Sequence, residues 1–231
     1  MKTANIIIGV LIIILMTHAI AFAGTWSDGF AGNTLDQKWT GDRDNFSVAD
    51  GYLQGRNAHP IQLIPPKWVE IGKDWDDYAV TCRINVVLPN LLVCTKGALI
   101  LRRSGNEGYV FALHVATKTV EVYRLSNEEM LLSVNKDLQL EKWYMAKAEL
   151  QGDSMFFYLD NELIGKINDK RSASGTVGLA VQDVLTVLFD DFIITGPKID
   201  DGSAEVKAIN KIPITWAKLK IEYYLGGIIW K

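Results

Sequence analysis

Histidine and cysteine are scarce in this chain. Its 231 residues include three histidines and two cysteines, Cys82 and Cys94. His18 falls in an apolar N-terminal segment, which leaves His59 and His114 for the rest of the chain. Zinc sites bring several His, Cys or carboxylate ligands to one point. Two histidines far apart in sequence therefore argue against a zinc site that relies on imidazole ligands.

Other signatures of known chemistry are missing as well. The sequence contains neither a Gly-x-Ser-x-Gly nucleophile elbow nor a phosphate-binding glycine loop. It also lacks an excess of basic charge, because 24 Lys and Arg side chains stand against 27 Asp and Glu side chains. Nucleic-acid binding requires a basic stripe on the surface. We therefore expect no nucleic-acid partner.

A helical period is absent from the central part of the chain. Residues 78–86 instead alternate apolar with polar side chains, which is typical of a half-buried strand. Asp50-Gly51 separates two β-like runs, and this dipeptide is a strong hairpin signal. Many short strands with regular turns predict an all-β domain in which two antiparallel sheets pack face to face. The expected strands are an opening strand within residues 24–39, then residues 46–49, 52–54, 78–88, 97–103, 109–116, 119–125, 143–151, 154–160, 163–167, 175–181 and 187–196.

The first 23 residues have the three parts of a secretory signal peptide. Lys2 supplies the positive charge, residues 6–16 are apolar, and Ala21-Phe22-Ala23 fits the small-x-small cleavage rule. The apolar run is shorter than the ~20 residues that a membrane span needs. An uncleaved membrane anchor is the alternative.

Cleavage after Ala23 predicts an exported bacterial protein without a transmembrane span, in the periplasm, on the cell surface or outside the cell. Removing Lys2 leaves 23 of the 24 basic side chains against 27 acidic ones, a net charge of −4 with neutral histidine. Export would place Cys82 and Cys94 where a disulfide can form. The two are not directly opposite in the expected hairpin around Pro89-Asn90, so a disulfide and two buried thiols both stay open.

The composition changes after Gly196-Pro197. Residues 198–211 are polar and predict a linker. Farther on, Trp216, Leu219 and Tyr223 share one face of a short helix. This tail either docks on the domain or binds a protein partner or a membrane surface. The predicted organisation is a signal peptide at residues 1–23, a β-sandwich at 24–196, and a linker with a C-terminal tail at 197–231.

A series of turn and core motifs follows one order along the chain. They are Asp28-Gly29-Phe30, Trp39, the run from Phe46 to Leu53, Trp75-Asp76-Asp77-Tyr78, the run from Gly97 to Arg102, Trp143-Tyr144, Tyr158-Leu159-Asp160-Asn161, the run from Gly175 to Leu179, and Phe189-Asp190-Asp191-Phe192. This order resembles the concanavalin A-like lectin and glucanase superfamily, in particular its laminin G-like and 3-keto-disaccharide hydrolase (DUF1080) domains.

The resemblance covers residues 24–196 and implies a jelly-roll sandwich of two curved antiparallel sheets. Family members often bind or process carbohydrate, so a glycan is the expected partner. Retaining glucanases of this fold carry a Glu-x-Asp-x-x-Glu strand that supplies the acid and the nucleophile. This sequence has no such strand, which favours binding over cleavage.

Two carboxylates interrupt an apolar strand near the end of the domain. Asp190 and Asp191 lie between Phe189 and Phe192, where charge needs a cation, solvent or hydrogen bonds. In related carbohydrate-binding sandwiches an acid near the first strand and a closing Asp-Asp pair hold calcium, and the resemblance assigns this role to Asp28 with Asp190 or Asp191. Calcium takes six to eight oxygen ligands. The alternative is a solvated pair, or one that accepts backbone N–H bonds.

The segment 109–125 predicts a hairpin that turns at Thr117-Lys118. A two-residue turn places His114 opposite Glu121, with Tyr123 on the same face, away from the apolar layer. The carboxylate would favour a charged imidazole, so this pair is the tentative acid–base pair of any catalysis. The alternative is a cross-strand contact that contributes well under ~1 kcal/mol.

Four further residues are candidates for ligand binding. Arg102 and Arg103 end the neighbouring strand, and one of them must point to the face of His114. An arginine there can hydrogen-bond sugar hydroxyls. Trp68, in a proline-rich loop on the rim, and Trp75 are available to stack on sugar rings, whereas Trp143 is expected to be structural.

Three functions follow from these residues. The first is an exported, non-catalytic carbohydrate-binding sandwich that holds a glycan on one sheet face. The second is a glycoside-cleaving enzyme of the 3-keto-disaccharide hydrolase type that uses His114 or Glu121. The third is a structural adhesion module. The sequence favours the first because it lacks the paired carboxylates of the glucanases.

Overall fold

The computed structural model describes residues 23–57, 65–89, 95–182, 184–200 and 202–203. Within these ranges the chain is all-β apart from one 3-10 turn at Arg43–Asn45, which confirms the predicted class. No helix in the described part is long and apolar enough to cross a membrane. The predicted signal peptide, apart from Ala23, and the tail from residue 204 onward lie outside the described residues.

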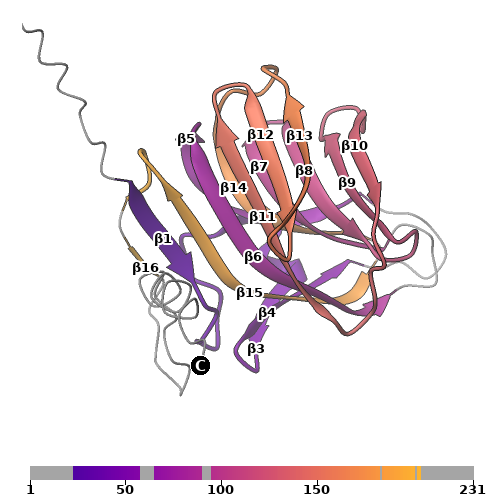
Figure 1. The fold of residues 1–231 in the computed structure, drawn as a ribbon. Helices are drawn as coiled ribbons and strands as arrows, with labels where there is room; N and C mark the ends of the chain where they lie inside the picture. The colour runs from indigo at the N-terminus through magenta and orange to yellow at the C-terminus, as the bar shows by residue number, and fades with distance from the viewer. Residues whose placement is uncertain (1–22, 58–64, 90–94, 183, 201, 204–231) are drawn as a thin grey trace, which may run out of the picture.

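The strands form two sheets (Figure 1). The larger, nine-stranded sheet has the order β13-β12-β11-β6-β15-β1-β16, with β4 beside β15 and β3 beside β4. The seven-stranded sheet has the order β10-β9-β8-β7-β14-β5-β2. Neighbouring strands are antiparallel, as expected for a jelly-roll sandwich. The exception is the pair of β1 and β16, which is parallel. The bounds are β1 Gly24–Asp28, β2 Thr40–Gly41, β3 Phe46–Ala49, β4 Tyr52–Asn57, β5 Lys67–Trp75, β6 Tyr78–Pro89, β7 Lys96–Ser104, β8 Glu107–His114, β9 Thr119–Arg124, β10 Met130–Asn135, β11 Trp143–Gln151, β12 Ser154–Leu159, β13 Glu162–Asn168, β14 Gly175–Gln182, β15 Val184–Gly196 and β16 Gly202–Ser203.

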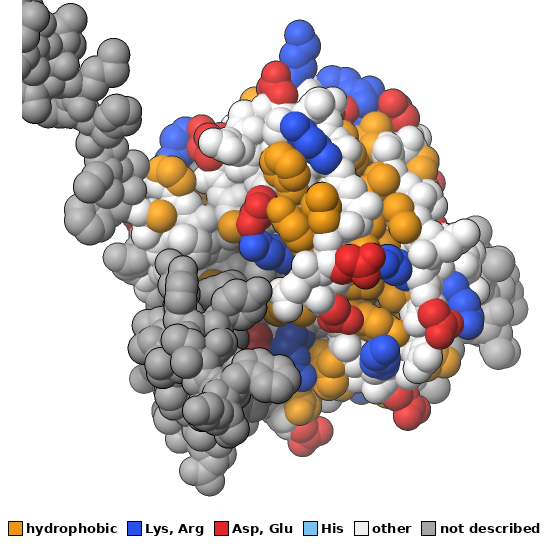
Figure 2. Space-filling model, in the orientation of Figure 1, with side chains coloured by type: hydrophobic (Ala, Val, Ile, Leu, Met, Phe, Trp, Pro, Cys, Tyr) orange, Lys and Arg blue, Asp and Glu red, His pale blue; other side chains and the backbone are white. Residues whose placement is uncertain are grey.

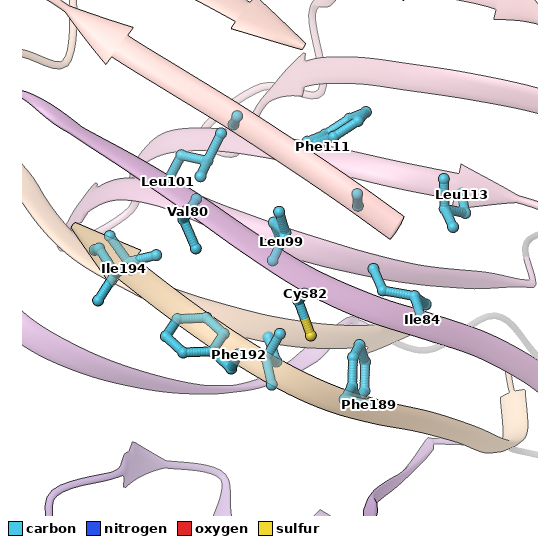
Figure 3. Close-up of a cluster of buried hydrophobic side chains, with 14 of the residues drawn as sticks. Val80, Cys82, Ile84, Leu99, Leu101, Phe111, Leu113, Phe189, Phe192 and Ile194 are labelled. Carbon is cyan, nitrogen blue, oxygen red and sulfur yellow. The ribbon is translucent and has the colours of Figure 1, made fainter. Parts of the chain in front are cut away.

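The main hydrophobic core lies between the two sheets (Figure 3). Every second residue of β6 points inward, so that Val80, Cys82 and Ile84 are fully buried. Side chains from β7, β8 and β15 meet them from both layers. Phe111 of β8 packs edge-on against Phe157 of β12, with ring centroids 5.1 Å apart. Burial of such side chains contributes roughly 1.5–3 kcal/mol each.

A bulge in β15 explains the motif of two carboxylates between two phenylalanines. Phe189 and Phe192 are both fully buried although they are three residues apart, which simple alternation forbids. The pairing with β6 shifts register between Asp190 and Ile193, and Asp191 takes a positive φ of 49°. The extra residue returns Phe192 to the core.

Three expectations about single elements need correction. The sequence placed Trp68 in a loop, but it lies in β5, which was not predicted. It also missed β10. Trp143 was expected at a core position, but it is half-buried beside the Arg83 guanidinium, at 4.5 Å from its ring centroid. Cys82 has a buried free thiol, and Cys94 lies outside the described residues.

Candidate functional site: the outer face of the seven-stranded sheet

The hairpin of β8 and β9 places His114 and Glu121 on the face that points away from the core. His114 pairs with Thr119 and Ala112 with Glu121, two residues away from the predicted register. The turn consists of the four residues 115–118, whereas the sequence predicted a two-residue turn. Lys118 in this turn has a positive φ of 57°. A shift of two residues leaves each side chain on its predicted face.

Glu121 is the centre of a polar network on this face. Its Oε1 lies 2.8 Å from His114 Nδ1 and accepts a 2.8 Å hydrogen bond from the Thr119 hydroxyl. Lys96 Nζ lies 3.0 Å from Oε2. Burial disfavours the charged carboxylate, but the bonds from His114, Lys96 and Thr119 outweigh it and lower the pKa of Glu121 to about 2.

Tyr123 adds an aromatic ring to this network. It lies two residues after Glu121 on the same strand and the same face, and Lys96 Nζ lies 4.8 Å from its ring centroid. At this distance the ring attracts the ammonium group. Lys96 thus joins an anion and a ring. We call Tyr123, Glu121, Lys96 and His114 the Tyr123 cluster.

A bulge at the end of β7 decides which arginine reaches this face. Arg102 takes a positive φ of 47°, and the pairing with β8 shifts register after Leu101. Arg102 is 1% exposed and donates to the backbone carbonyls of Asp76 at 2.7 and 2.9 Å and Gly152 at 2.9 Å. Its role is therefore to hold one end of the sandwich together, and Arg103 is the arginine on the outer face.

Arg103 is part of a second polar network. Its guanidinium carbon lies 4.5 Å from the centroid of a Trp68 ring, and its Nη1 lies 2.6 Å from Glu70 Oε1. The Thr176 hydroxyl donates to Glu70 Oε2 at 2.7 Å. We call Trp68, Glu70, Arg103 and Thr176 the Trp68 cluster.

Small and apolar side chains form the floor between the two clusters. This floor is a second hydrophobic cluster, separate from the core, and includes Ala98, Ile100, Ala112 and Ala180. Each of these four is at most 3% exposed. A small hollow over the floor, about 10 Å³ in volume, is lined by Lys96 and Tyr123 together with Pro66, Gln182 and floor residues.

The structure assigns Trp75 to another place. Although it ends β5, its side chain packs against the main core and covers Gly72, whose positive φ of 82° turns the strand. The structure therefore unites His114, Glu121, Tyr123, Arg103 and Trp68 on one face and leaves out Trp75 and Arg102.

The three carboxylates proposed for calcium have protein partners. Asp28 accepts hydrogen bonds from Phe30 N at 2.8 Å and Trp39 Nε1 at 2.9 Å. Burial raises its pKa despite these two bonds. The Arg83 Nη1 lies 3.6 Å from Asp190 and 3.2 Å from Asp191.

The described residues contain no group of three or more His, Cys, Asp or Glu side chains placed to hold a metal ion. Calcium binding stays a prediction. It can be tested by treating the protein with a chelator, removing the chelator, and titrating in calcium chloride in a calorimeter.

The sequence did not indicate three residues of this face, namely Lys96, Glu70 and Thr176. Trp68-x-Glu70 has the spacing of two residues on one strand face, and this signal was available once β5 was recognised. The role of Lys96 depends on a strand two positions away in the sheet, so the local sequence carries no sign of it.

No protein-family model matches the sequence, and no curated protein matches it. Similar folds occur among solved structures. The carbohydrate-binding module CBM66 from Bacillus subtilis has a TM-score of 0.58 and 20% identity over 70% of this chain and 95% of its own. A β-1,3-1,4-glucanase (lichenase) derived from a mouse hindgut metagenome has a TM-score of 0.58 and 11% identity over 75% and 99%.

A larger protein contains the same fold as one part. BlXynB, a GH43 protein from Bacillus licheniformis, has a TM-score of 0.59 and 16% identity over 74% of this chain but only 39% of its own. Identities this low show the fold alone. That fold is the jelly-roll β-sandwich, and nothing extends the likeness to the 3-keto-disaccharide hydrolase group.

Proposed function

We propose that this protein is an exported carbohydrate-binding β-sandwich that holds a glycan on the outer face of its seven-stranded sheet. The observation that carries this proposal is the Tyr123 cluster beside a hollow. Glu121, Lys96 and His114 supply hydrogen-bonding groups for hydroxyls, and Tyr123 supplies a ring. A site with an apolar surface and a few convergent polar groups is the usual form of a small-ligand site. Export rests on the signal-peptide features of residues 1–23.

The chemistry of the site supports binding rather than glycoside cleavage. Glycosidases use two carboxyl groups about 5–9.5 Å apart. Glu121 on β9 and Glu70 on β5 are separated by four strand spacings, or roughly 19 Å. A carboxyl group with a pKa of about 2 is also a weak base and cannot serve as an acid near neutral pH.

A glycan array tests the proposal. We expect the purified protein to retain a subset of glycans, and Tyr123→Ala to retain the longer ones more weakly. Tyr158→Ala is the matched control, because Lys147 Nζ lies 5.1 Å from the Tyr158 ring centroid on β12, in the other sheet. No retained glycan would reject the proposal and favour the structural adhesion module. Loss of binding in Tyr158→Ala alone would move the site to the other sheet.

The enzyme alternative has its own assay. The 2.8 Å contact between His114 and Glu121 has the geometry of an acid–base pair. Incubation with 3-keto-disaccharides should release no product if the face only binds. Turnover that disappears in His114→Ala would establish the enzyme instead, whereas turnover unchanged in that variant would exclude His114 as the catalytic group.

A further inference from the structure

The outer face of the seven-stranded sheet contains one arrangement twice. Two adjacent rows of side chains cross β5, β14, β7, β8 and β9, as the strand registers define. One row begins with an aromatic residue and ends with a glutamate, and the next begins with a glutamate and ends with an aromatic residue. The rows are Trp68, Ala180, Ala98, Ala112, Glu121, and Glu70, Gly178, Ile100, Val110, Tyr123.

A half-turn about an axis perpendicular to the sheet exchanges the two clusters. The axis passes through β7 between Ala98 and Ile100. Both cations come from β7, one on each side of this point, and each reaches across one strand in the opposite direction. Lys96 crosses β8 to reach β9, and Arg103 crosses β14 to reach β5.

The two clusters also agree in their contacts. In each, a cation lies over a ring, at 4.8 Å in one and 4.5 Å in the other. Each cation pairs with a glutamate, at 3.0 and 2.6 Å. A further polar side chain meets each glutamate, at 2.8 and 2.7 Å. The corresponding residues are Tyr123 and Trp68, Glu121 and Glu70, Lys96 and Arg103, and His114 and Thr176.

The geometry points to two equivalent subsites for an uncharged oligosaccharide, one at the Tyr123 cluster and one at the Trp68 cluster. This inference rests on the proposed function and adds the second subsite, the length and the charge of the ligand. Each subsite places an aromatic ring, with Tyr123 7% exposed, beside an ion pair that can donate and accept hydrogen bonds with hydroxyl groups.

The ion pairs determine the charge of the ligand. Within each cluster one cation is neutralised by one glutamate in direct contact. An anionic sugar would compete with that glutamate for the cation, and a cationic sugar would compete with the cation. A neutral polyol instead hydrogen-bonds both partners without separating them.

The spacing determines the length. β5 and β9 are four strand spacings apart, which is roughly 19 Å in a flat sheet. One sugar ring cannot reach both clusters. The floor between them includes Ala98, Ile100, Ala112 and Ala180, each at most 3% exposed, and at Gly178 a Cβ would lie 2.2 Å from the carbonyl oxygen of Val69. A ligand that occupies both clusters must therefore be an extended oligosaccharide that spans this distance.

Calorimetry with a length series of uncharged oligosaccharides tests this inference. The series is built on the glycan retained on the array. We expect affinity to rise with length until both clusters are occupied, and Trp68→Ala and Tyr123→Ala each to weaken the longest member about tenfold or more. The monosaccharide should bind both variants nearly as well as the unmodified protein, because each retains one subsite.

Trp143→Ala is the matched control for Trp68→Ala. Trp143 lies on the nine-stranded sheet, and the guanidinium carbon of Arg83 is 4.5 Å from the centroid of its ring. Arg103 lies at the same distance from the Trp68 ring. Figure 2 shows the side of β11–β13, where charged and apolar side chains are interspersed. The control should keep full affinity. If Trp68→Ala does not fold, Glu70→Gln removes the charge of the same subsite with a smaller change in shape.

The outcomes separate the two proposals. If Tyr123→Ala loses the long oligosaccharide while Trp68→Ala and Glu70→Gln keep it, the second subsite is rejected and the proposed function stands. If no glycan is retained at all, the proposed function itself fails. Preference for an anionic glycan, or an affinity that falls steeply with added salt, would overturn the assignment of a neutral ligand.

Discussion

Replacing Glu121 by glutamine should destabilise the fold in a way that depends on pH. The pKa of Glu121 falls from 4.5 to about 2 in the folded protein. A carboxyl group whose folded pKa lies below its unfolded pKa stabilises the fold above the unfolded value. This stabilisation disappears as the pH falls from about 4.5 to about 2. At 1.36 kcal/mol for each pKa unit, it amounts to at most about 3 kcal/mol.

Urea unfolding of both proteins across this pH range measures the effect. At about pH 7 we expect Glu121→Gln to unfold with a free energy about 2–3 kcal/mol lower than that of the unmodified protein. The gap should close as the pH approaches about 2, because the unmodified carboxyl group is then protonated as well. Since both proteins share every other titrating group, these contributions largely cancel in the difference.

A gap that stays constant between these pH values would refute the reasoning. It would mean that glutamine disturbs the packing and that the ion pair with Lys96 contributes nothing. Glu162→Gln is the control. Its side chain is 69% exposed beside Lys136, at 2.8 Å, and exposed pairs contribute under ~1 kcal/mol. The control should therefore show a small difference at every pH.

Three further substitutions test the scaffold by the same urea unfolding. Arg102→Leu should lower the free energy of unfolding by about 3 kcal/mol, since backbone carbonyls on three segments lose a charged, buried donor; a loss below about 1 kcal/mol would show that solvent replaces it. Phe157→Ala should cost about 3–5 kcal/mol, because the side chain is fully buried against Phe111, and unchanged stability would contradict its place in the core. Gly178→Ala should cost about 1–3 kcal/mol because of the 2.2 Å approach of its Cβ to the Val69 oxygen, and a neutral result would mean that β5 shifts freely.

The sequence predicted the elements whose signal is local. Alternation over residues 78–86 located β6, and Asp50-Gly51 located the turn between β3 and β4. The resemblance placed Asp28 near the closing Asp190-Asp191 pair, and β1 indeed pairs with β15, with Asp28 opposite Phe192. The face on which His114 lies was also predicted. The apolar side of its strand must face the core, so the alternate side chains, including His114, point outward.

The features that the sequence missed depend on distant parts of the chain. β5 has only two fully inward apolar residues, Val69 and Ile71, before Gly72 turns the strand. The bulge that separates Arg102 from Arg103 needs a non-glycine residue at positive φ, which no local pattern indicates. The paired clusters exist only through the order of β5, β14, β7, β8 and β9.

The outer face of the seven-stranded sheet is more elaborate than stability requires. A sandwich is stabilised by the core between its sheets, and here that core is complete without the two clusters. Removing one partner of a buried ion pair is costly, but replacing the whole pair by hydrophobic side chains is often neutral or stabilising. The two cation–glutamate pairs beside aromatic rings, whose charged side chains are at most 17% exposed, therefore need an explanation other than folding. Recognition of a polyhydroxylated ligand supplies one, because it requires donors, acceptors and rings held in advance in fixed positions.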